Sequence, residues 1–569
     1  MGPRVYLLML AGLVAACNPT AAVPAAPGTQ PSPQVQGAQP GPGGPKRLSI
    51  AVMGDPPALS QKIVSAGGAG VPGADLIAKM INAGLTTPDP ARTLHPELAD
   101  VVPSLDNGHW QVSPNGTMVT TWTLRPGAKW QDGVPFTSDD ILFSAQVAQD
   151  PTVTVFHDLA FDSIASVEAP DPQTIVVHWK EPYIAADGLF DGTQVLPRHL
   201  LESVFTTDRG NFINAPYWSR DFVGTGAYRL QEWNRGSYLL LEANPDYVLG
   251  KPHIDEVKVL TIPDPDTLAA NILAGNVDLT VDRNLGADQA EQVAGQWTQG
   301  KVYTPPSSSL LMYPQFIEPD PPAIADPQFR RALMYGLDRQ AMADSLVGPG
   351  LSSVAEIFLD PTQPEYPAIQ TALVHYAYDP GRAAAMLASL GYQKGADGTY
   401  HDSAGGSVNL EIRSRGIEVG LRATLAVADA WQQLGLASTP VIVPPQRGQD
   451  RVYMSTFPGF LLYNQPSDIT FLKRITGAQT PLPGNNYVGL NYSRYTDPQL
   501  DAGIAQVFRT IPWEARMEAL GGVVHQMADQ LLLMDLFYNV MPVLEASRVQ
   551  GVTPNSVNET WNASNWDVS

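Results

Sequence analysis

The chain has 569 residues, of which 44% are hydrophobic and one is cysteine, and its formal charge is -22. Because a single core stops growing at roughly 250–300 residues, this length predicts two or three lobes. The negative charge argues against a nucleic-acid partner or a broad docking face for anionic lipids, and the single cysteine excludes an intramolecular disulfide framework and a thiolate metal cluster.

The N-terminus has the features of an export signal. Arg4 precedes the apolar run Val5–Ala16, which is too short to span a bilayer. The run ends in Val14-Ala15-Ala16 before Cys17, which resembles the bacterial lipobox, in which the cysteine is lipidated and the chain is cut just before it. Lipidation would anchor the protein on the extracytoplasmic side of the cell membrane, in the periplasm or at the cell surface. The alternative is an ordinary signal peptide that contains a chance cysteine.

The next segment, residues 18–46, predicts a linker. It is dominated by Pro, Ala, Gly and Gln and has almost no large apolar side chain to bury. No later stretch approaches 18 consecutive apolar residues, so we expect the remainder to be soluble. From Lys46 onward strand and helix patterns mix without a fixed repeat, which favours an α/β or α+β protein.

Strand patterns recur along the body of the chain. In chain order they predict strands at Leu48–Met53, Thr120–Leu124, Thr174–Trp179 and Val257–Ile262. Tyr228–Trp233 and Tyr238–Glu242 flank Asn234-Arg235-Gly236, which predicts a hairpin with a glycine-containing turn. Gly224 and Gly226 precede this hairpin, and we expect them at a chain crossing where side chains would clash.

Helix starts are marked by capping residues. Thr137 and Asp140 match a capping box ahead of Ile141–Val147. An Asp can accept unpaired N–H groups while a following Pro takes the first helical position, so three more starts are predicted at Asp326-Pro327, Asp379-Pro380 and Asp497-Pro498. Apolar residues at steps of three and four predict one long helix from Trp513 to Leu531.

Several motifs occur in an order that resembles a known family. The longest runs from Trp122 to Ser144 and combines a strand, Arg-x-Gly, an aromatic residue, Asp-Gly and a helix that begins Ser-x-Asp. Further segments follow, namely Gly224–Arg229, Asn244–Tyr247, Gly250–Pro252, Ala274–Asp278, Asp326–Asp338, Tyr378–Tyr392 and Asn491–Ser493. From about residue 47 to 555, the series resembles family 5 of the bacterial extracellular solute-binding proteins, the oligopeptide, dipeptide and nickel group.

The resemblance implies an α/β, periplasmic-binding-protein-like fold of the large peptide-binding type, with two lobes, a hinge and an extra subdomain. After the signal peptide with its lipidated cysteine (1–17) and the linker (18–46), the implied parts are lobe one (47–88, 222–305 and 535–569), its appended subdomain (89–221) and lobe two (306–534). Ligand binding would favour the closed form, because only that form surrounds the ligand from both sides.

The sequence lacks catalytic motifs. It contains no Gly-x-Ser-x-Gly, Ser-x-x-Lys or His-Glu-x-x-His, and its nine histidines have no metal-ligand spacing. Gly68–Gly73 has the letters of a dinucleotide loop, but Pro72 favours a surface turn. Gly295–Lys301 is near a phosphate loop, but Val302 stands where a hydroxyl residue is required. We therefore expect a binding protein and no enzyme, with no catalytic residue, cofactor or metal.

The resemblance also implies where the ligand binds. Family members line the cleft with the end of the first strand, the segment entering lobe two and the loop before Asn491. The candidate ligand-binding residues from these segments are Met53, Tyr313, Phe316, Phe460, Tyr463, Asn464 and Asp468. Several peptide-binding relatives place an acid in that loop to pair with the ligand's amino group, whereas here it reads Leu461-Leu462-Tyr463-Asn464. Either Asp468 serves instead, or Tyr463 and Asn464 hydrogen-bond a neutral ligand beside Phe460.

The implied function is that of a monomeric, lipid-anchored receptor of an ABC import system. It would bind a peptide or similarly sized solute and deliver it to an ABC permease complex in the membrane. Two alternatives stay open, a membrane-tethered hydrolase and a sensor that passes its closed state to a membrane partner without transport.

Overall fold

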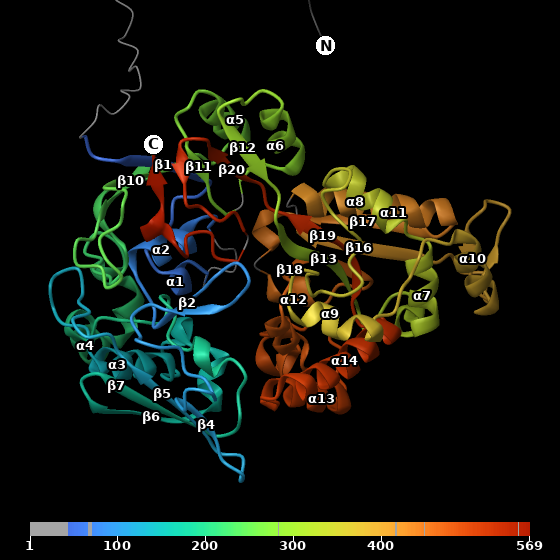
Figure 1. Ribbon diagram of the computed structural model, residues 1–569. Helices are drawn as coiled ribbons and strands as arrows, with labels where there is room; N and C mark the ends of the chain where they lie inside the picture. Colours follow the sequence, from blue (N-terminus) through green and yellow to red (C-terminus); the bar gives the residue numbers. More distant parts are fainter. Residues whose placement is uncertain (1–43, 66–70, 283, 416–417, 449, 556) are drawn as a thin grey trace, which may run out of the picture. The chain divides into compact units, whose positions relative to one another are not determined.

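A computed structural model describes residues 44–65, 71–282, 284–415, 418–448, 450–555 and 557–569. The predicted signal peptide, Cys17 and nearly all of the linker lie outside these residues. Residues 45–569 form one compact unit that contains three sheets of four or more strands (Figure 1). No helix in the described part of the chain combines the length and the apolar character that a membrane span requires.

The first sheet has seven strands in the order β12-β20-β11-β1-β10-β9-β8. They are β1 (Arg47–Val52), β8 (Tyr228–Asn234), β9 (Tyr238–Ala243), β10 (Glu256–Thr261), β11 (Leu279–Thr280), β12 (Gly300–Tyr303) and β20 (Val543–Ala546). Two of the predicted strands are the parallel pair β1 and β10, and the predicted hairpin is β8 and β9, with Gly236 at φ 71° in its turn. Ile50, Ala51 and Val52 are all buried, as expected for a strand covered on both faces.

A four-stranded antiparallel sheet is inserted between β1 and β8 in the sequence. Its order is β4-β5-β7-β6, with β4 (Trp110–Val112), β5 (Met118–Thr123), β6 (Ile164–Asp171) and β7 (Thr174–Trp179). Helix α3 (Ser138–Ala148) contacts β6 and β7, and α4 (Arg198–Thr207) packs on α3. The Asp140 carboxylate accepts the Thr137 N–H (3.0 Å), as the predicted capping box requires.

The five-stranded sheet lies in the sequence between β12 and β20. Its order is β17-β16-β18-β13-β19, with β13 (Pro306–Pro314), β16 (Asn409–Arg415), β17 (Ala437–Val443), β18 (Phe460–Pro466) and β19 (Met534–Val540). Helix α11 (Glu418–Leu434) covers β16 and β17 and buries Trp431 against Phe460, with ring centroids 5.0 Å apart. This sheet has an apolar core of its own.

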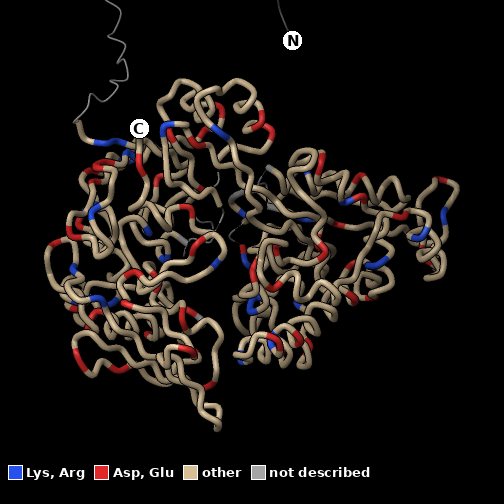
Figure 2. The backbone as a smooth tube through the Cα atoms, viewed as in Figure 1, with Lys and Arg blue, Asp and Glu red and all other residues tan. Residues whose placement is uncertain are grey.

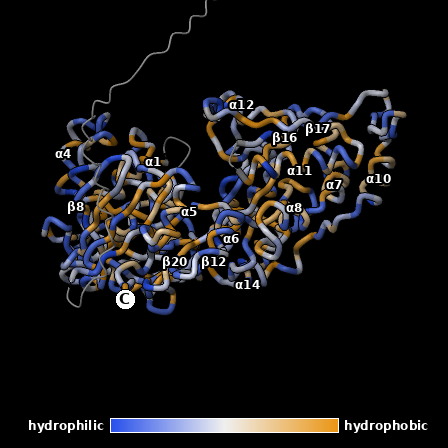
Figure 3. The backbone as a smooth tube through the Cα atoms, turned by 90° about the horizontal axis from the view of Figure 1, so that it is seen from above, coloured by the Kyte–Doolittle hydropathy of each residue, from blue (hydrophilic) through white to orange (hydrophobic). Residues whose placement is uncertain are grey.

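We call residues 45–303 and 543–569 the first body and residues 306–540 the second body. Only two chain segments connect them in the described structure, Thr304-Pro305 from β12 to β13 and Met541-Pro542 from β19 to β20. The Met541 N–H donates to the Pro305 carbonyl (2.9 Å), so the two connections lie side by side. Figure 3 shows apolar segments in orange inside both bodies and hydrophilic segments along their outside.

The three predicted Asp-Pro helix starts are confirmed in α7 (Pro327–Tyr335), α10 (Pro380–Ser389) and α13 (Pro498–Arg509). In each helix the preceding aspartate accepts a backbone N–H of the first turn at 2.8 Å. The long helix predicted from Trp513 is α14 (Trp513–Gln530), and its C-terminal cap is Leu531. These elements could be predicted because their signals are local.

The predicted chain crossing involves Gly224, Gly226 and the end of α2 (Ala74–Ile81). The Gly226 N–H donates to the Ile81 carbonyl (3.1 Å), and the Thr225 N–H donates to Asn82 Oδ1 (3.2 Å). A Cβ on Gly224 would lie 1.9 Å from the Ile81 oxygen, and a Cβ on Gly226 would lie 2.5 Å from the Ile81 carbonyl carbon. Only glycine therefore lets the two backbones approach this closely.

Glu97 is a buried carboxyl group in the first body. It accepts hydrogen bonds from the Tyr247 hydroxyl (2.6 Å) and the Gly84 N–H (3.2 Å), while burial raises its pKa from 4.5 to about 7. The folded state holds this proton more tightly than the unfolded chain does. The proton therefore adds its full contribution to the free energy of unfolding below pH 4.5, and this contribution is lost as the pH rises through 7.

Replacing Glu97 with glutamine is therefore expected to flatten part of the pH dependence of stability. Glutamine keeps the side-chain shape and cannot ionise, so from pH 5 to pH 7.5 the variant should gain about 2 kcal/mol of unfolding free energy relative to the wild type. Urea denaturation of both proteins at the two pH values measures this difference. Parallel pH profiles for the two proteins would contradict it.

Candidate ligand-binding cavity

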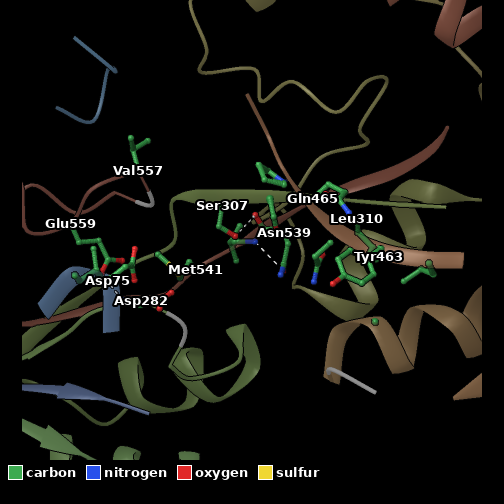
Figure 4. Close-up of a pocket in the computed structure, with 17 residues that line it drawn as sticks. Asp75, Asp282, Ser307, Leu310, Tyr463, Gln465, Asn539, Met541, Val557 and Glu559 are labelled. Carbon is green, nitrogen blue, oxygen red and sulfur yellow. Dashed lines mark hydrogen bonds between the residues drawn. The ribbon is translucent and has the colours of Figure 1, made fainter. Parts of the chain in front are cut away.

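A cavity of about 440 Å³ lies where the two bodies meet (Figure 4). This volume is in the range of roughly 300–1,000 Å³ that small-molecule sites occupy. The first body contributes Asp75, Leu76, Asp282, Val557 and Glu559; the second body contributes Ser307, Ser308, Leu310, Gly420, Leu462–Pro466, Asn539 and Val540; and Met541 belongs to a connecting segment. These described lining residues include three carboxylates and no Lys or Arg.

The three carboxylates gather at the first-body end of the cavity. Asp75 lies at the start of α2, Asp282 follows β11, and Glu559 comes from the C-terminal segment, so the fold joins three distant parts of the chain here (Figure 4). The Asp282 carboxylate accepts the Gly73 N–H (2.6 Å), and the Asp282 N–H donates to Glu559 Oε2 (2.5 Å). These two bonds fix the Asp282 and Glu559 carboxylates to the backbone.

The environment of two of these carboxylates, Glu559 and Asp75, favours their neutral forms. Burial, with smaller contributions from Asp282 and Asp75, raises the pKa of Glu559 well above its usual range, and the side chain is only 4% exposed. Burial also raises the pKa of Asp75. This effect outweighs the opposite effect of Lys79, whose Nζ lies 4.0 Å from Asp75 Oδ2. The second carboxylate oxygen of Glu559, Oε1, is buried and has no hydrogen-bond partner among the described residues.

The opposite wall is formed by the second half of β18. Antiparallel pairing with β13 places Tyr463 opposite Leu311 and Asn464 opposite Leu310. Asn464 Oδ1 is buried and accepts no hydrogen bond from the described residues, and the Tyr463 ring lies 5.8 Å from the ring of Tyr492. Leu310 adds apolar surface next to these polar groups. This wall can therefore contact an apolar part of a ligand and still offer a hydrogen-bond acceptor.

The cavity wall nearest the connecting segments comes from β13 and β19. Ser307 Oγ donates to the Asn539 carbonyl (3.2 Å), which joins the two strands where they line the cavity. Met541 follows on the connection to β20. The cavity is thus lined by Met541 of one connecting segment and by Ser307, which lies two residues after the other.

Of the seven ligand-binding candidates from the sequence, the structure brings Tyr463 and Asn464 to the cavity. Tyr313 and Phe460 are instead completely buried in the interior. Phe460 packs on Trp431 because it lies at the start of β18, where both faces are covered, whereas the cavity opens farther along the strand.

The other three candidates also lie outside the cavity lining. Met53 packs against an apolar cluster of the first body, and Phe316 lies under the guanidinium of Arg330, 4.7 Å from its ring centroid. Asp468 accepts the Thr470 N–H (2.9 Å) at the start of a 3-10 helix, and its carboxylate lies 3.6 Å from Arg92. Asp468 is thus engaged with its own loop and with the first body.

Asp75, Asp282 and Glu559 were not predicted from the sequence. Each is an isolated acid in a segment without a motif, and only the crossover connections of the first sheet bring the three together. Part of the predicted surface turn, Gly68–Gly70, lies outside the described residues. Gly73, at the end of that turn, has φ 84° and precedes α2, which places its N–H against Asp282.

A second set of contacts joins the two bodies independently of the connecting segments. Arg509 pairs with Glu181 (2.6 Å), the Lys473 ammonium donates to the Tyr183 hydroxyl (2.7 Å), and the Ile184 N–H donates to the Phe508 carbonyl (3.0 Å). Burial lowers the pKa of Lys473 to about 8. Such contacts between the segment 181–184 and the second body hold the bodies together on the side of the four-stranded sheet.

No group of three or more His, Cys, Asp or Glu in the described chain has an arrangement that could hold a metal ion. The three carboxylates of the cavity, Asp75, Asp282 and Glu559, form no such arrangement.

Several known proteins and one family model are similar to this chain. A family model described as "Bacterial extracellular solute-binding proteins, family 5 Middle" matches residues 100–476. A Brucella ovis protein named as an ABC transporter peptide-binding protein is 29% identical over 287 residues, which are 50% of this chain and 51% of that protein. The chain thus spans about half the length of the curated relatives that it matches first.

Two further likenesses extend over more of the chain. The oligopeptide-binding protein AppA of Bacillus subtilis is 25% identical over 403 residues, or 67% of this chain and 70% of that protein. The crystal structure of NikZ from Campylobacter jejuni in complex with Ni(L-His) has a TM-score of 0.73 at 21% identity and covers 92% of this chain and 99% of that one. The structural likeness confirms the predicted α/β, periplasmic-binding-protein-like fold.

Proposed function

The chain belongs to family 5 of the bacterial extracellular solute-binding proteins, and we propose that it is the receptor of an ABC import system that captures a peptide or similarly sized solute. Proteins of this family bind solutes and are not enzymes, which agrees with the lack of catalytic motifs in the sequence. The observation that carries the proposal is the cavity of about 440 Å³ walled by both bodies. The peptide-binding names of the Brucella and Bacillus relatives support a peptide as the solute.

Capture occurs by closure of the two bodies over the solute. Backbone rotation at 304–305 and 541–542 would move the second body relative to the first without breaking either sheet, since these are the connections between them in the described chain. A solute that touches both walls binds the closed form more tightly and so shifts the equilibrium toward it. We take lobe two as 306–540, beyond the boundary expected at 534, because β19 is part of the five-stranded sheet.

The receptor is held at the membrane by lipidated Cys17, and residues 18–46 form the tether. This proposal rests on the apolar run and the small residues before the cysteine. The closed, loaded form hands the solute to an ABC permease complex on the extracytoplasmic face.

Retention of peptides from a defined mixture tests the proposed function. The protein is stripped of bound solute by unfolding and refolding, mixed with an enzymatic digest of casein, freed of unbound peptides by filtration and then denatured. Mass spectrometry of the released fraction should show a small set of peptides strongly enriched over the digest, and the same sample kept in urea should retain none. Equal, unenriched recovery from the folded and the unfolded protein would contradict the proposal.

A further inference from the structure

We propose that the solute carries an amino group, and that Glu559, together with Asp75 and Asp282, binds this group at the first-body end of the cavity. The inference rests on the proposed function and names the chemistry of its ligand. It places recognition of the amino group on the first body, in a carboxylate cluster formed by three separate segments of the chain.

The unpaired oxygen of Glu559 is the first observation that points to a ligand. Glu559 Oε2 accepts the Asp282 N–H (2.5 Å), whereas Oε1 is buried without a partner among the described residues, on a side chain that is 4% exposed and lines the cavity. When Glu559 is ionised, as it would be beside an ammonium group, Oε1 is a buried acceptor without a donor, which is unfavourable. An N–H from the cavity would satisfy it.

The charges around the cavity are the second observation. The described lining residues supply three carboxylates and no Lys or Arg. The neighbouring cation is Lys79, whose Nζ lies 4.0 Å from Asp75 Oδ2. Burial and mutual repulsion raise the pKa values of Glu559 and Asp75, so an approaching ammonium would favour their ionised forms. Acidic residues outnumber basic ones 56 to 34 in the whole chain, and Figure 2 shows them distributed over both bodies, which favours the approach of a cation.

Among the described residues that line the cavity, those of the second body include no acid that could compete for the same group. The acid in its cavity loop, Asp468, accepts the Thr470 N–H and lies 3.6 Å from Arg92, outside the cavity lining. The β18 wall instead presents Tyr463, Asn464 and apolar side chains. The cavity is therefore asymmetric, with carboxylates on the first body and a neutral wall on the second, so an amino group is expected at the carboxylate end.

The experiment compares the casein digest with the same digest after acetylation by acetic anhydride, which converts primary amines to neutral amides. Wild-type protein should retain peptides from the untreated digest and lose them from the acetylated one. Glu559→Gln keeps an oxygen for the Asp282 N–H but removes the charge, so it should retain roughly 10- to 100-fold less of the same peptides. Glu518→Gln, on an exposed position of α14, is the matched control and should retain them as wild type does.

The outcomes separate this inference from the proposed function. Equal retention of acetylated and untreated peptides, or unchanged retention by Glu559→Gln, would overturn amino-group recognition and leave the receptor function in place. Retention of nothing from either digest by the wild type would overturn both. Circular dichroism and thermal unfolding report whether Glu559→Gln is folded; if it is not, Asp75→Asn removes charge from the same cluster at a partly exposed position and should weaken retention in the same direction.

Discussion

Replacing Ser307 with tryptophan is expected to lower the affinity for the retained peptides by about 100-fold or more, which corresponds to about 2.8 kcal/mol. Ser307 lies on β13 at the cavity wall beside the connecting segments, and its hydroxyl donates to the Asn539 carbonyl (3.2 Å). An indole at this position would occupy space in the cavity of about 440 Å³ and would also obstruct closure. Equilibrium dialysis of one retained peptide against both proteins measures the effect.

The matched control is Ser166→Trp, which puts the same side chain on an exposed position of β6, in the four-stranded sheet. This variant should bind the peptide as the wild type does. If Ser307→Trp is folded and binds with unchanged affinity, the solute does not occupy the cavity between the bodies.

Gly226→Ala is expected to destabilise the first body by about 3 kcal/mol or more and to lower its unfolding temperature by about 6–12 °C. The added Cβ would lie 2.5 Å from both the Ile81 carbonyl carbon and the Met80 oxygen, and these backbone atoms cannot move without disturbing the end of α2. Because α2 begins at the carboxylate end of the cavity, peptide affinity should fall as well.

Gly210→Ala serves as the control for Gly226→Ala. Gly210 has open space where its Cβ would be placed, so alanine there should leave the unfolding temperature within about 2 °C of the wild type. Differential scanning calorimetry of both variants measures the effect. A Gly226→Ala protein as stable as the Gly210→Ala protein would show that the crossing of the two backbones is looser than the structure indicates.

Much of the fold could be predicted because its signals are local. The Asp-Pro helix starts depend on contacts within one helical turn, and they recur as the starts of α7, α10 and α13. The hairpin of β8 and β9 follows from a glycine turn between two strand patterns. The two glycines of the chain crossing were also predicted, but their partner, Ile81, could not be, because the contact joins positions more than 140 residues apart.

The cavity was harder to predict for a physical reason. Its carboxylates come from three segments that only the crossovers of the first sheet bring together, so no short spacing identifies Asp75, Asp282 and Glu559. On the second body the correct segment was predicted, but as a loop before Asn491 and not as strand β18, and without showing which of its residues are accessible. Phe460 is covered on the α11 side by Trp431, whereas Tyr463 and Asn464, farther along β18, line the cavity.

The distance between the two bodies, with and without solute, tests the capture mechanism most directly. Spin labels at Gln111 on β4 and Gln499 on α13, both exposed, would report this distance in a protein whose only native cysteine is replaced by serine. Addition of a retained peptide should convert a broad or longer distance distribution into a single shorter one. An unchanged distribution at saturating peptide would show that binding does not close the two bodies, and would contradict the account.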